Sequence, residues 1–164
     1  MAPPPFIDIE ASGFGSASYP VEVGLVLPNG DVFCSLILPE PDWTHWDVRA
    51  EEVHGIDREL LLHHGRPATE VALDINQHLQ GLIVYCDSWY HDFTWLSRLY
   101  QTTNVAPNFR LEDLRSLLNQ AEADHWRIAK EAVVSEMHLP RHRASNDARV
   151  LQATLARVQV MTAG

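Results

Sequence analysis

The chain has 164 residues, of which 46% are hydrophobic and 21% charged. This composition is typical of a globular protein with a buried core and excludes a disordered chain. The formal net charge is −10, so the chain lacks the excess of Lys and Arg with which proteins coat duplex nucleic acid. The length favours one domain spanning residues 1–164.

The sequence also bears on the compartment. No apolar run approaches the roughly 18 residues of a membrane span, and the N-terminus lacks a basic stretch followed by an apolar one. Cys34 and Cys86 lie in apolar runs, where a buried free thiol is the commoner state. We therefore expect a cytoplasmic protein with no membrane segment. Its charge is uneven, because residues 1–109 hold 15 acidic and 4 basic side chains, and residues 110–164 hold 7 and 8.

Strands are predicted first along the chain. Short β-prone apolar runs occur at 6–9, 21–27 and 32–38, and Asn29-Gly30 between the last two is a strong hairpin signal. A loop rich in Pro and Trp follows at 39–47.

Helical spacing then alternates with strand patterns. Leu60 and Leu61 lie in a short helical segment, and Val71 to Leu79 lie in a second that ends before Gly81. Further elements are predicted in this order: a buried strand at 82–86, a helix containing Phe93, Leu96, Leu99 and Tyr100, a short strand at 108–111, and helices at 121–137 and 145–160. This order predicts a mixed α/β sheet with helices packed on it.

Asp8 and Glu10 end the first predicted strand. Residues two apart on a strand share a face, so both carboxylates can bind one ion. The turn that follows, 11–15, consists mostly of small residues and lets backbone approach a ligand closely. On its own the pair equally fits solvated surface acids, since Asp57 and Glu59 repeat the same spacing.

Asp87 and Asp92 lie where the strand at 82–86 passes into a helix. Asp92 belongs to the first turn of that helix, beside Phe93. Asp87 lies at the end of the strand. Helix capping is the alternative role for either carboxylate, because Asp is favoured at helix N-termini.

His142 precedes Asp147 by five residues, after Pro140 and before the last helix. This spacing places His142 on a loop and Asp147 in the first helical turn. A loop histidine is free to meet a water molecule. The alternative is an ordinary exposed basic loop.

Together these three elements resemble the DEDDh family of 3′→5′ exonucleases, in order as well as content. Asp8-Ile9-Glu10-Ala11-Ser12-Gly13 matches the first motif of the family, Asp92-Phe93-Thr94-Trp95-Leu96 the second, and the segment from His142 to Arg149 the third. His54-Gly55-Ile56 is similar to a segment found between the first two motifs. Spacing to the following helix favours Asp92 over Asp87 in the second motif.

The resemblance implies a ribonuclease-H-like mixed sheet of about five strands flanked by helices. It implies two ions per active site, Mg²⁺ or Mn²⁺, which are the ions that oxygen ligands select. Asp8, Glu10 and Asp147 would hold one ion, Asp8 and Asp92 the other, and His142 would be the general base. Substrate-binding residues implied by the resemblance are Ala11, Ser12, Gly13 and Phe14.

The expected activity is hydrolysis of single-stranded RNA or DNA ends and short oligonucleotides, from the 3′ end, to nucleoside 5′-monophosphates. Arg141, Arg143 and Arg149 are candidates for phosphate contacts, and Trp43, Trp46 and Trp89 for base stacking. A homodimer is compatible with this expectation. Two alternatives are a noncatalytic binding module of the same fold and a ribonuclease-H-like endonuclease, which has no need of the His142 motif.

Overall fold

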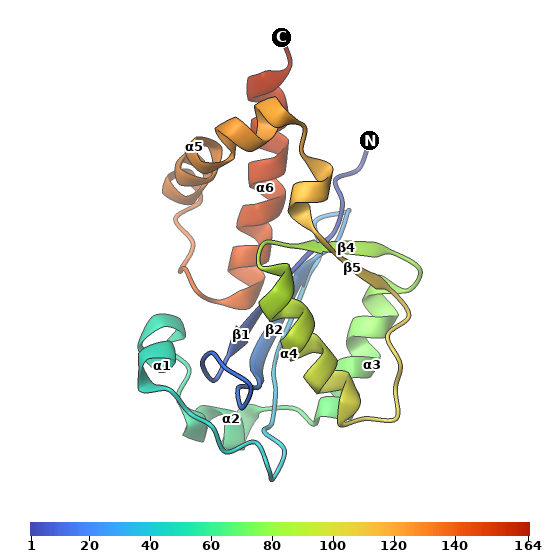
Figure 1. Ribbon diagram of the computed structural model, residues 1–164, viewed down its shortest axis with the longest axis vertical. Helices are drawn as coiled ribbons and strands as arrows, with labels where there is room; N and C mark the ends of the chain where they lie inside the picture. Colours follow the sequence, from blue (N-terminus) through green and yellow to red (C-terminus); the bar gives the residue numbers. More distant parts are fainter.

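The computed structural model describes residues 1–164, and at its centre lies a five-stranded sheet in the order β3-β2-β1-β4-β5 (Figure 1). The first three strands are antiparallel, whereas β4 runs parallel to β1 and β5 parallel to β4. The strands are β1 (Phe6–Ala11), β2 (Pro20–Val26), β3 (Val32–Leu36), β4 (Ile83–Cys86) and β5 (Arg110–Asp113). This confirms the predicted mixed α/β class.

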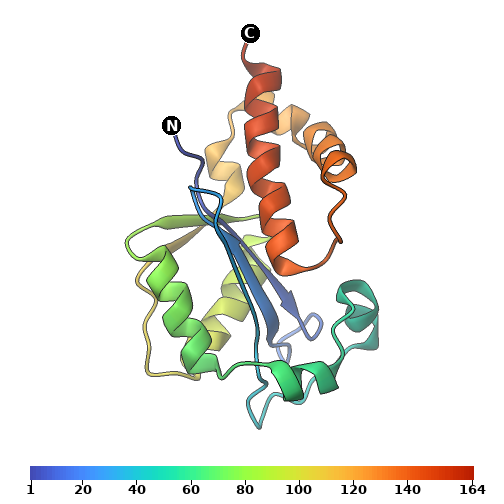
Figure 2. The ribbon, with the colours of Figure 1, turned by 180° about the vertical axis from the view of Figure 1, so that it is seen from behind.

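Six α-helices and one short 3₁₀ helix accompany the sheet. They are α1 (Val48–His54), α2 (Arg58–His64), α3 (Ala68–Leu79), α4 (Trp89–Gln101), the 3₁₀ helix Leu114–Leu117, α5 (Gln120–Met137) and α6 (Ala144–Thr162). None of these helices is long and apolar enough to cross a membrane. Seen from behind, α6 lies in front of the sheet, and both chain ends lie at the same end of the molecule (Figure 2).

Helix α1 was not predicted from the sequence. It spans seven residues, and both of its valines, Val48 and Val53, are exposed, so it has no apolar face to detect. The side chain of Asp47 caps it by accepting a hydrogen bond from the backbone N–H of Arg49. Capping of this kind stabilises a helix that packing alone would not predict.

The two faces of the central strands have different roles. Ile7 and Ile9 of β1 belong to the main hydrophobic core together with residues of α3 and α4. Asp8 and Glu10 alternate with them and therefore point to the opposite face. Their partners in the antiparallel register are Gly24 for Asp8 and Glu22 for Glu10. The face that carries the acidic pair is thus the face that α6 covers.

Gly24 allows α6 to approach this face closely. A Cβ atom at position 24 would overlap the backbone nitrogen of Ser145 and the carbonyl carbon of Ala144. Because Gly24 lies directly opposite Asp8, the first turn of α6 arrives beside the Asp8 carboxylate. The absence of a side chain at Gly24 therefore leaves room for α6 to pack beside Asp8 and Glu10.

We expect Gly24→Ala to lower the free energy of unfolding by about 3 kcal/mol or more, because the backbone of α6 would have to shift to admit the methyl group. Cys34→Ala is a suitable control, since Cys34 lies opposite Gly24 on β3 and is exposed. It should change stability by less than about 0.5 kcal/mol. Chemical denaturation measures both. Equal stability of the two variants would contradict the close approach.

One prediction about the cysteines is wrong. Cys86 is buried, but Cys34 is exposed. The apolar run containing Cys34 forms β3, an edge strand of the sheet. No helix of the main core covers that side chain, so the hydrophobic sequence pattern alone overestimated its burial.

Candidate active site

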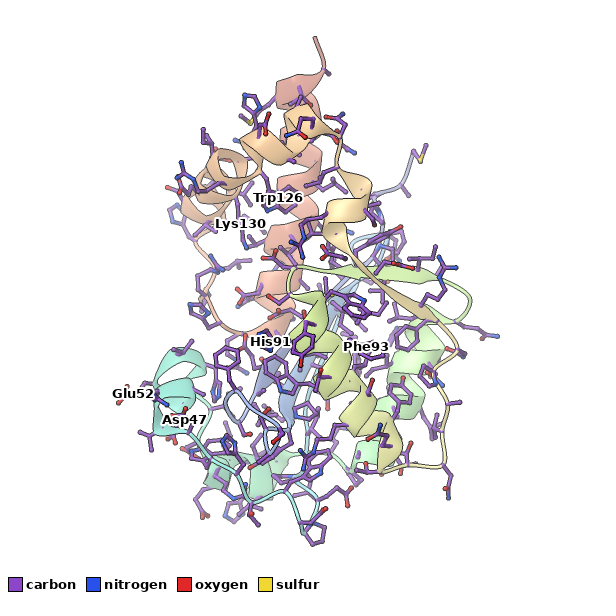
Figure 3. All side chains as sticks on the ribbon, viewed as in Figure 1. Asp47, Glu52, His91, Phe93, Trp126 and Lys130 are labelled. Carbon is purple, nitrogen blue, oxygen red and sulfur yellow. The ribbon has the colours of Figure 1, made fainter.

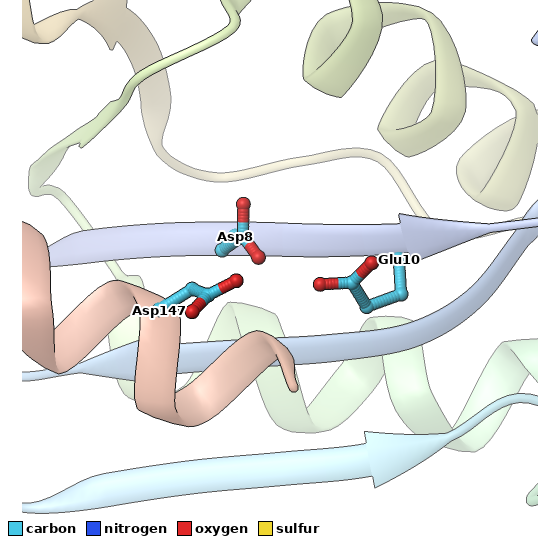
Figure 4. Close-up of side chains that lie close together, drawn as sticks. All are labelled: Asp8, Glu10 and Asp147. Carbon is cyan, nitrogen blue, oxygen red and sulfur yellow. The ribbon is translucent and has the colours of Figure 1, made fainter. Parts of the chain in front are cut away.

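Three carboxylates from two distant segments meet at one point. Asp8 and Glu10 come from β1 and Asp147 from the first turn of α6, and oxygen atoms of all three lie within 4.8 Å of one another (Figure 4). Carboxylate oxygens are the ligands that Mg²⁺ and Mn²⁺ prefer. The first and third sequence motifs therefore converge as the resemblance implies.

Asp92 lies near this trio but outside the group of three. It is only 2% exposed, and its Oδ2 atom has no hydrogen-bond partner. A buried carboxylate oxygen without a partner is costly. A cation bound beside it would satisfy it, so the donor set fits a divalent metal.

Asp87 occupies a different position. Its Oδ2 atom lies 2.7 Å from Nζ of Lys130 on α5, and its side chain is 41% exposed. Asp92, by contrast, is close enough to raise the pKa of Asp8. Asp92 is therefore the acidic residue of this segment that lies near Asp8, while Asp87 is paired with Lys130.

Burial and mutual repulsion raise the pKa values of Asp8, Glu10 and Asp92. The pKa of Asp8 is raised well above its ordinary value, by burial first and then by the charges of Asp92, Glu10 and Asp147. Burial, joined by the charge of Asp147, raises the pKa of Glu10 to about 8. Burial also raises the pKa of Asp92 to about 7. The cluster is therefore destabilised when all its members are ionised.

This electrostatic arrangement predicts how stability depends on pH. Between about pH 4.5 and 8 the folded chain retains protons on Glu10 and Asp92 that the unfolded chain has released. Stability without divalent ions should therefore fall as the pH rises through this window. We expect Asp92→Asn to exceed wild type in stability at pH 8 by on the order of 2 kcal/mol, and much less at pH 5.

Chemical denaturation in chelator at the two pH values measures this difference. Glu59→Gln is the control, because Glu59 is exposed and should show no such change. Added Mg²⁺ should remove the advantage of Asp92→Asn over wild type. A variant advantage that is the same at pH 5 and pH 8 would contradict the electrostatic explanation.

His142 lies on the loop before α6, as predicted. Its backbone is in the left-handed region, with φ of 61°, and its side chain is exposed. Its N–H donates to both carboxylate oxygens of Asp147, at 3.1 and 3.3 Å. The backbone of His142 is thus fastened to one of the clustered carboxylates, while its imidazole remains free of hydrogen bonds within the chain.

An ion pair between a buried glutamate and a half-exposed arginine holds the same loop against the sheet. Glu22 is 4% exposed and accepts hydrogen bonds from the guanidinium of Arg143 and from the backbone N–H of Ala144. Glu22 was missed in the sequence analysis. Its spacing from Gly24 in β2, on the face of Asp8 and Glu10, is the signal that could have identified it. Arg143 was a candidate for a phosphate contact, but its guanidinium is hydrogen-bonded to Glu22.

A cavity of about 370 Å³ opens beside Glu10. Three of the four predicted substrate-binding residues line it, namely Ala11, Gly13 and Phe14. Ser12 is fully buried, and its Oγ atom contacts Nδ1 of His45 at 2.9 Å. Apart from the segment at His54, the sequence did not indicate the opposite wall, which comes from α1 and its N-cap: Asp47, Arg49, Ala50, Val53 and His54.

His54 ties α1 to the end of β1. Its Nδ1 atom accepts a hydrogen bond from the N–H of Ile56, so Nε2 carries the proton and donates to the carbonyl of Ala11 at 3.2 Å. Burial lowers the pKa of this histidine, which favours the neutral ring. The segment noted in the sequence at His54 therefore holds the cavity wall in place.

Aromatic side chains lie at the cavity. Phe14 is 70% exposed, its ring centre lies 5.0 Å from that of His91, and His91 in turn stacks on Trp95. In the view of Figure 3, His91 lies between Asp47 and Lys130. The exposed ring of Phe14 is suited to stacking on a nucleobase.

The tryptophans singled out in the sequence have different surroundings. Trp43 is 1% exposed and stacks on Tyr19, so it belongs to the core and is unavailable to a ligand. Trp46 donates a hydrogen bond to Glu51. Trp89 is partly exposed, stacks on Phe93 and donates a hydrogen bond to the carbonyl of Leu111 in β5.

Comparison with known proteins identifies structures that share this fold. No protein-family model matches the sequence, and no curated relative does. The chain is similar to exonuclease I of E. coli in a zinc-bound complex with single-stranded DNA, with a TM-score of 0.75 and 14% identity over 99% of this chain. It is also similar to that protein with a dA16 oligonucleotide, with a TM-score of 0.74, 13% identity and 99% coverage.

A third similar structure is the exonuclease I of Methylocaldum szegediense, with a TM-score of 0.69 and 16% identity over 99% of this chain. The chain has the five-stranded, helix-flanked α/β fold of the ribonuclease-H-like class that the resemblance implied. At such identities the likeness shows the fold alone. The chain spans 41–42% of the length of these exonuclease I chains.

Proposed function

We propose that residues 1–164 form one exonuclease domain that hydrolyses single-stranded nucleic acid from the 3′ end and releases nucleoside 5′-monophosphates. The observation that carries this proposal is the convergence of Asp8, Glu10 and Asp147 within 4.8 Å, beside a cavity and a loop histidine. The shared fold with exonuclease I supports it.

In this proposal Asp8, Glu10 and Asp147 hold one divalent ion, and Asp8 with Asp92 holds a second, as Mg²⁺ or Mn²⁺. Bound ions of this kind lower the pKa of the attacking water and offset negative charge on the phosphoryl oxygens. The buried position of Asp92 limits access of bulk water to its carboxylate. The unpaired oxygen of Asp92 is available as a ligand without breaking an existing hydrogen bond.

His142 acts as general base and takes the proton of the attacking water at an imidazole nitrogen. Its exposed side chain and unengaged ring suit this role, and its N–H bond to Asp147 places it next to the cluster. The imidazolium then gives this proton to solvent, which regenerates the neutral ring. An imidazole is suited to this because its charge ordinarily changes between about pH 5 and 8.

The cavity beside Glu10 receives the terminal nucleotide. Its floor is the backbone of the turn after β1, and Phe14 offers a ring to the base. A free 3′-hydroxyl can approach Glu10, whereas a 3′-phosphate adds bulk and about −1.5 to −2 charges beside that carboxylate. The proposed site therefore binds a strand that ends in a 3′-hydroxyl in preference to one that ends in a 3′-phosphate. Single-stranded DNA is the ligand in the exonuclease I complexes, and single-stranded RNA is the second substrate to test.

The deciding experiment digests single-stranded DNA and RNA oligonucleotides, labelled at the 5′ or the 3′ end, with Mg²⁺ or Mn²⁺. We expect a 5′ label to give a ladder that shortens with time and a 3′ label to appear at once as mononucleotide. A 3′-phosphorylated twin should be degraded much more slowly, while a 5′-phosphate should make little difference. Chelator should abolish cleavage, and Ca²⁺ should not support it.

Asp8→Ala, purified in parallel, controls for contaminating nucleases. If the 3′ label appears first in fragments several nucleotides long and not as mononucleotide, the endonuclease alternative is favoured. Binding of the oligonucleotide without any cleavage would favour the noncatalytic module. Equal cleavage rates for the 3′-hydroxyl oligonucleotide and its 3′-phosphorylated twin would contradict the proposed pocket.

A further inference from the structure

Arg141 contacts one of the three clustered carboxylates. Its Nε atom lies 2.8 Å from Oδ1 of Asp147, and the two side chains are 33% and 14% exposed. The Nη groups of the same guanidinium make no hydrogen bond within the chain, because Nε to Asp147 is its single side-chain bond. A guanidinium can donate five N–H groups in a fixed fork. Most of the donor capacity of Arg141 is therefore unused in this structure.

The contact is unusual because of what Asp147 also faces. The same carboxylate lies within 4.8 Å of Asp8 and Glu10 oxygen atoms, in the position proposed for a divalent ion. A guanidinium at this carboxylate offsets part of the repulsion among the three acids. It also repels any second cation that enters the cluster. Arg141 and a divalent ion thus compete for Asp147.

Arg141 has a place to move to. It lines a groove of about 570 Å³ whose other walls include Lys130 and Arg127 on α5. Lys130 is paired with Asp87, and Arg127 with Glu131, so both cations are already compensated. Once separated from Asp147, Arg141 would be the uncompensated positive charge at this groove.

We propose that Arg141 is the counter-ion of Asp147 while no divalent ion is bound, and that ion binding releases it to contact a phosphate group of the nucleic acid strand in the groove. This inference rests on the proposed function for the identity of the ion and the strand. It makes Arg141 a positioning residue that couples the occupancy of the cluster to the binding of substrate. Cation and phosphate then each favour the binding of the other.

The first test measures Mn²⁺ affinity by calorimetry, without nucleic acid. Arg141→Met should bind Mn²⁺ at least about fivefold more tightly than wild type, because it removes both the competitor and the repulsion. Arg127→Met is the matched control, since it removes the same charge from the same groove but not from Asp147, and its affinity should stay within about twofold. Arg141→Lys keeps the charge and should remain nearer to wild type. If Arg141→Met binds Mn²⁺ more weakly or equally, the counter-ion role is overturned.

The second test measures binding of a fluorescent single-stranded oligonucleotide by anisotropy, in Ca²⁺ and in chelator. In Ca²⁺, Arg141→Met should bind several-fold more weakly than wild type, whereas in chelator the two should bind alike, because Asp147 then holds Arg141. An equal loss under both conditions would overturn the coupling. Thermal melting of each variant identifies any folding defect, and Arg141→Lys repeats the comparison if Arg141→Met fails to fold.

These readouts separate the inference from the proposed function. If the affinities change as expected but the wild-type protein cleaves nothing, the nuclease proposal fails and the role of Arg141 stands. If cleavage is observed and the affinities do not change, the nuclease proposal stands and the role of Arg141 is wrong. If wild-type protein and Arg141→Met both bind no Mn²⁺, both proposals fail.

Discussion

Asp8→Ala should reduce cleavage by roughly 10⁴-fold or more, equivalent to a barrier increase of about 5.5 kcal/mol. Asp8 is the member of the cluster whose pKa is raised by all of its acidic neighbours, Asp92, Glu10 and Asp147. In the proposed assignment it is also the carboxylate that both ions share. Loss of Asp8 should remove both ions. Loss of Asp92 should weaken only the second ion site, because Asp8, Glu10 and Asp147 all remain.

Single-turnover cleavage of a labelled oligonucleotide with Mn²⁺ measures the effect, and calorimetry measures the accompanying loss of ion binding. The chain contains its own control in the second Asp-x-Glu pair. Glu59 is exposed and remote from the cluster, so Glu59→Ala should retain wild-type rates. Substantial cleavage by Asp8→Ala would show that the nuclease does not use this cluster.

His142→Ala should fold, bind Mn²⁺ and cleave roughly 10²–10⁴-fold more slowly, the usual contribution of a general base. A general base acts only when unprotonated, so the wild-type rate should show a pH dependence that the variant lacks. It is measured at saturating Mn²⁺, so that protonation of Glu10 and Asp92 does not contribute to the profile. The backbone N–H that contacts Asp147 is retained in the variant. The loss should therefore appear in the chemical step and leave ion affinity nearly unchanged.

His138→Ala is the matched control, because His138 is also an exposed histidine with positive φ, a short distance earlier in the chain. It should keep the wild-type rate and pH profile. His142→Asn repeats the test without alanine in the left-handed region, which asparagine tolerates better. A pH profile identical to that of wild type in both His142 variants would assign the base to another group.

The sequence predicted the parts of the site that depend on local pattern. Alternation along β1 placed Asp8 and Glu10 on one face, and the five-residue spacing placed His142 on a loop and Asp147 in the first turn of α6. Both signals come from local geometry, because residues two apart on a strand share a face and Pro140 precedes a helix start. The resemblance to a family then supplied their convergence, which no local pattern contains.

What the sequence did not predict depends on contacts between distant segments. Helix α1, which forms a wall of the cavity, has no apolar face, and its cap at Asp47 was visible only once the structure was known. The pairing of Glu22 with Arg143 joins β2 to the loop before α6, and neither residue has a local partner. Burial of Trp43 likewise follows from stacking on Tyr19, which sequence spacing does not reveal.

The approach of α6 over Gly24 has a consequence for how the protein acquires its chemistry during folding. Asp8 and Glu10 are made early in translation and are fixed by the sheet, but the third carboxylate arrives only when α6 docks on β2. A partly folded chain with a complete sheet therefore has no trio of carboxylates. Any divalent ion that binds the trio stabilises the docked helix by mass action. Bound ion and docked helix therefore stabilise each other, and the capacity to bind the ion reports that α6 is docked on the sheet.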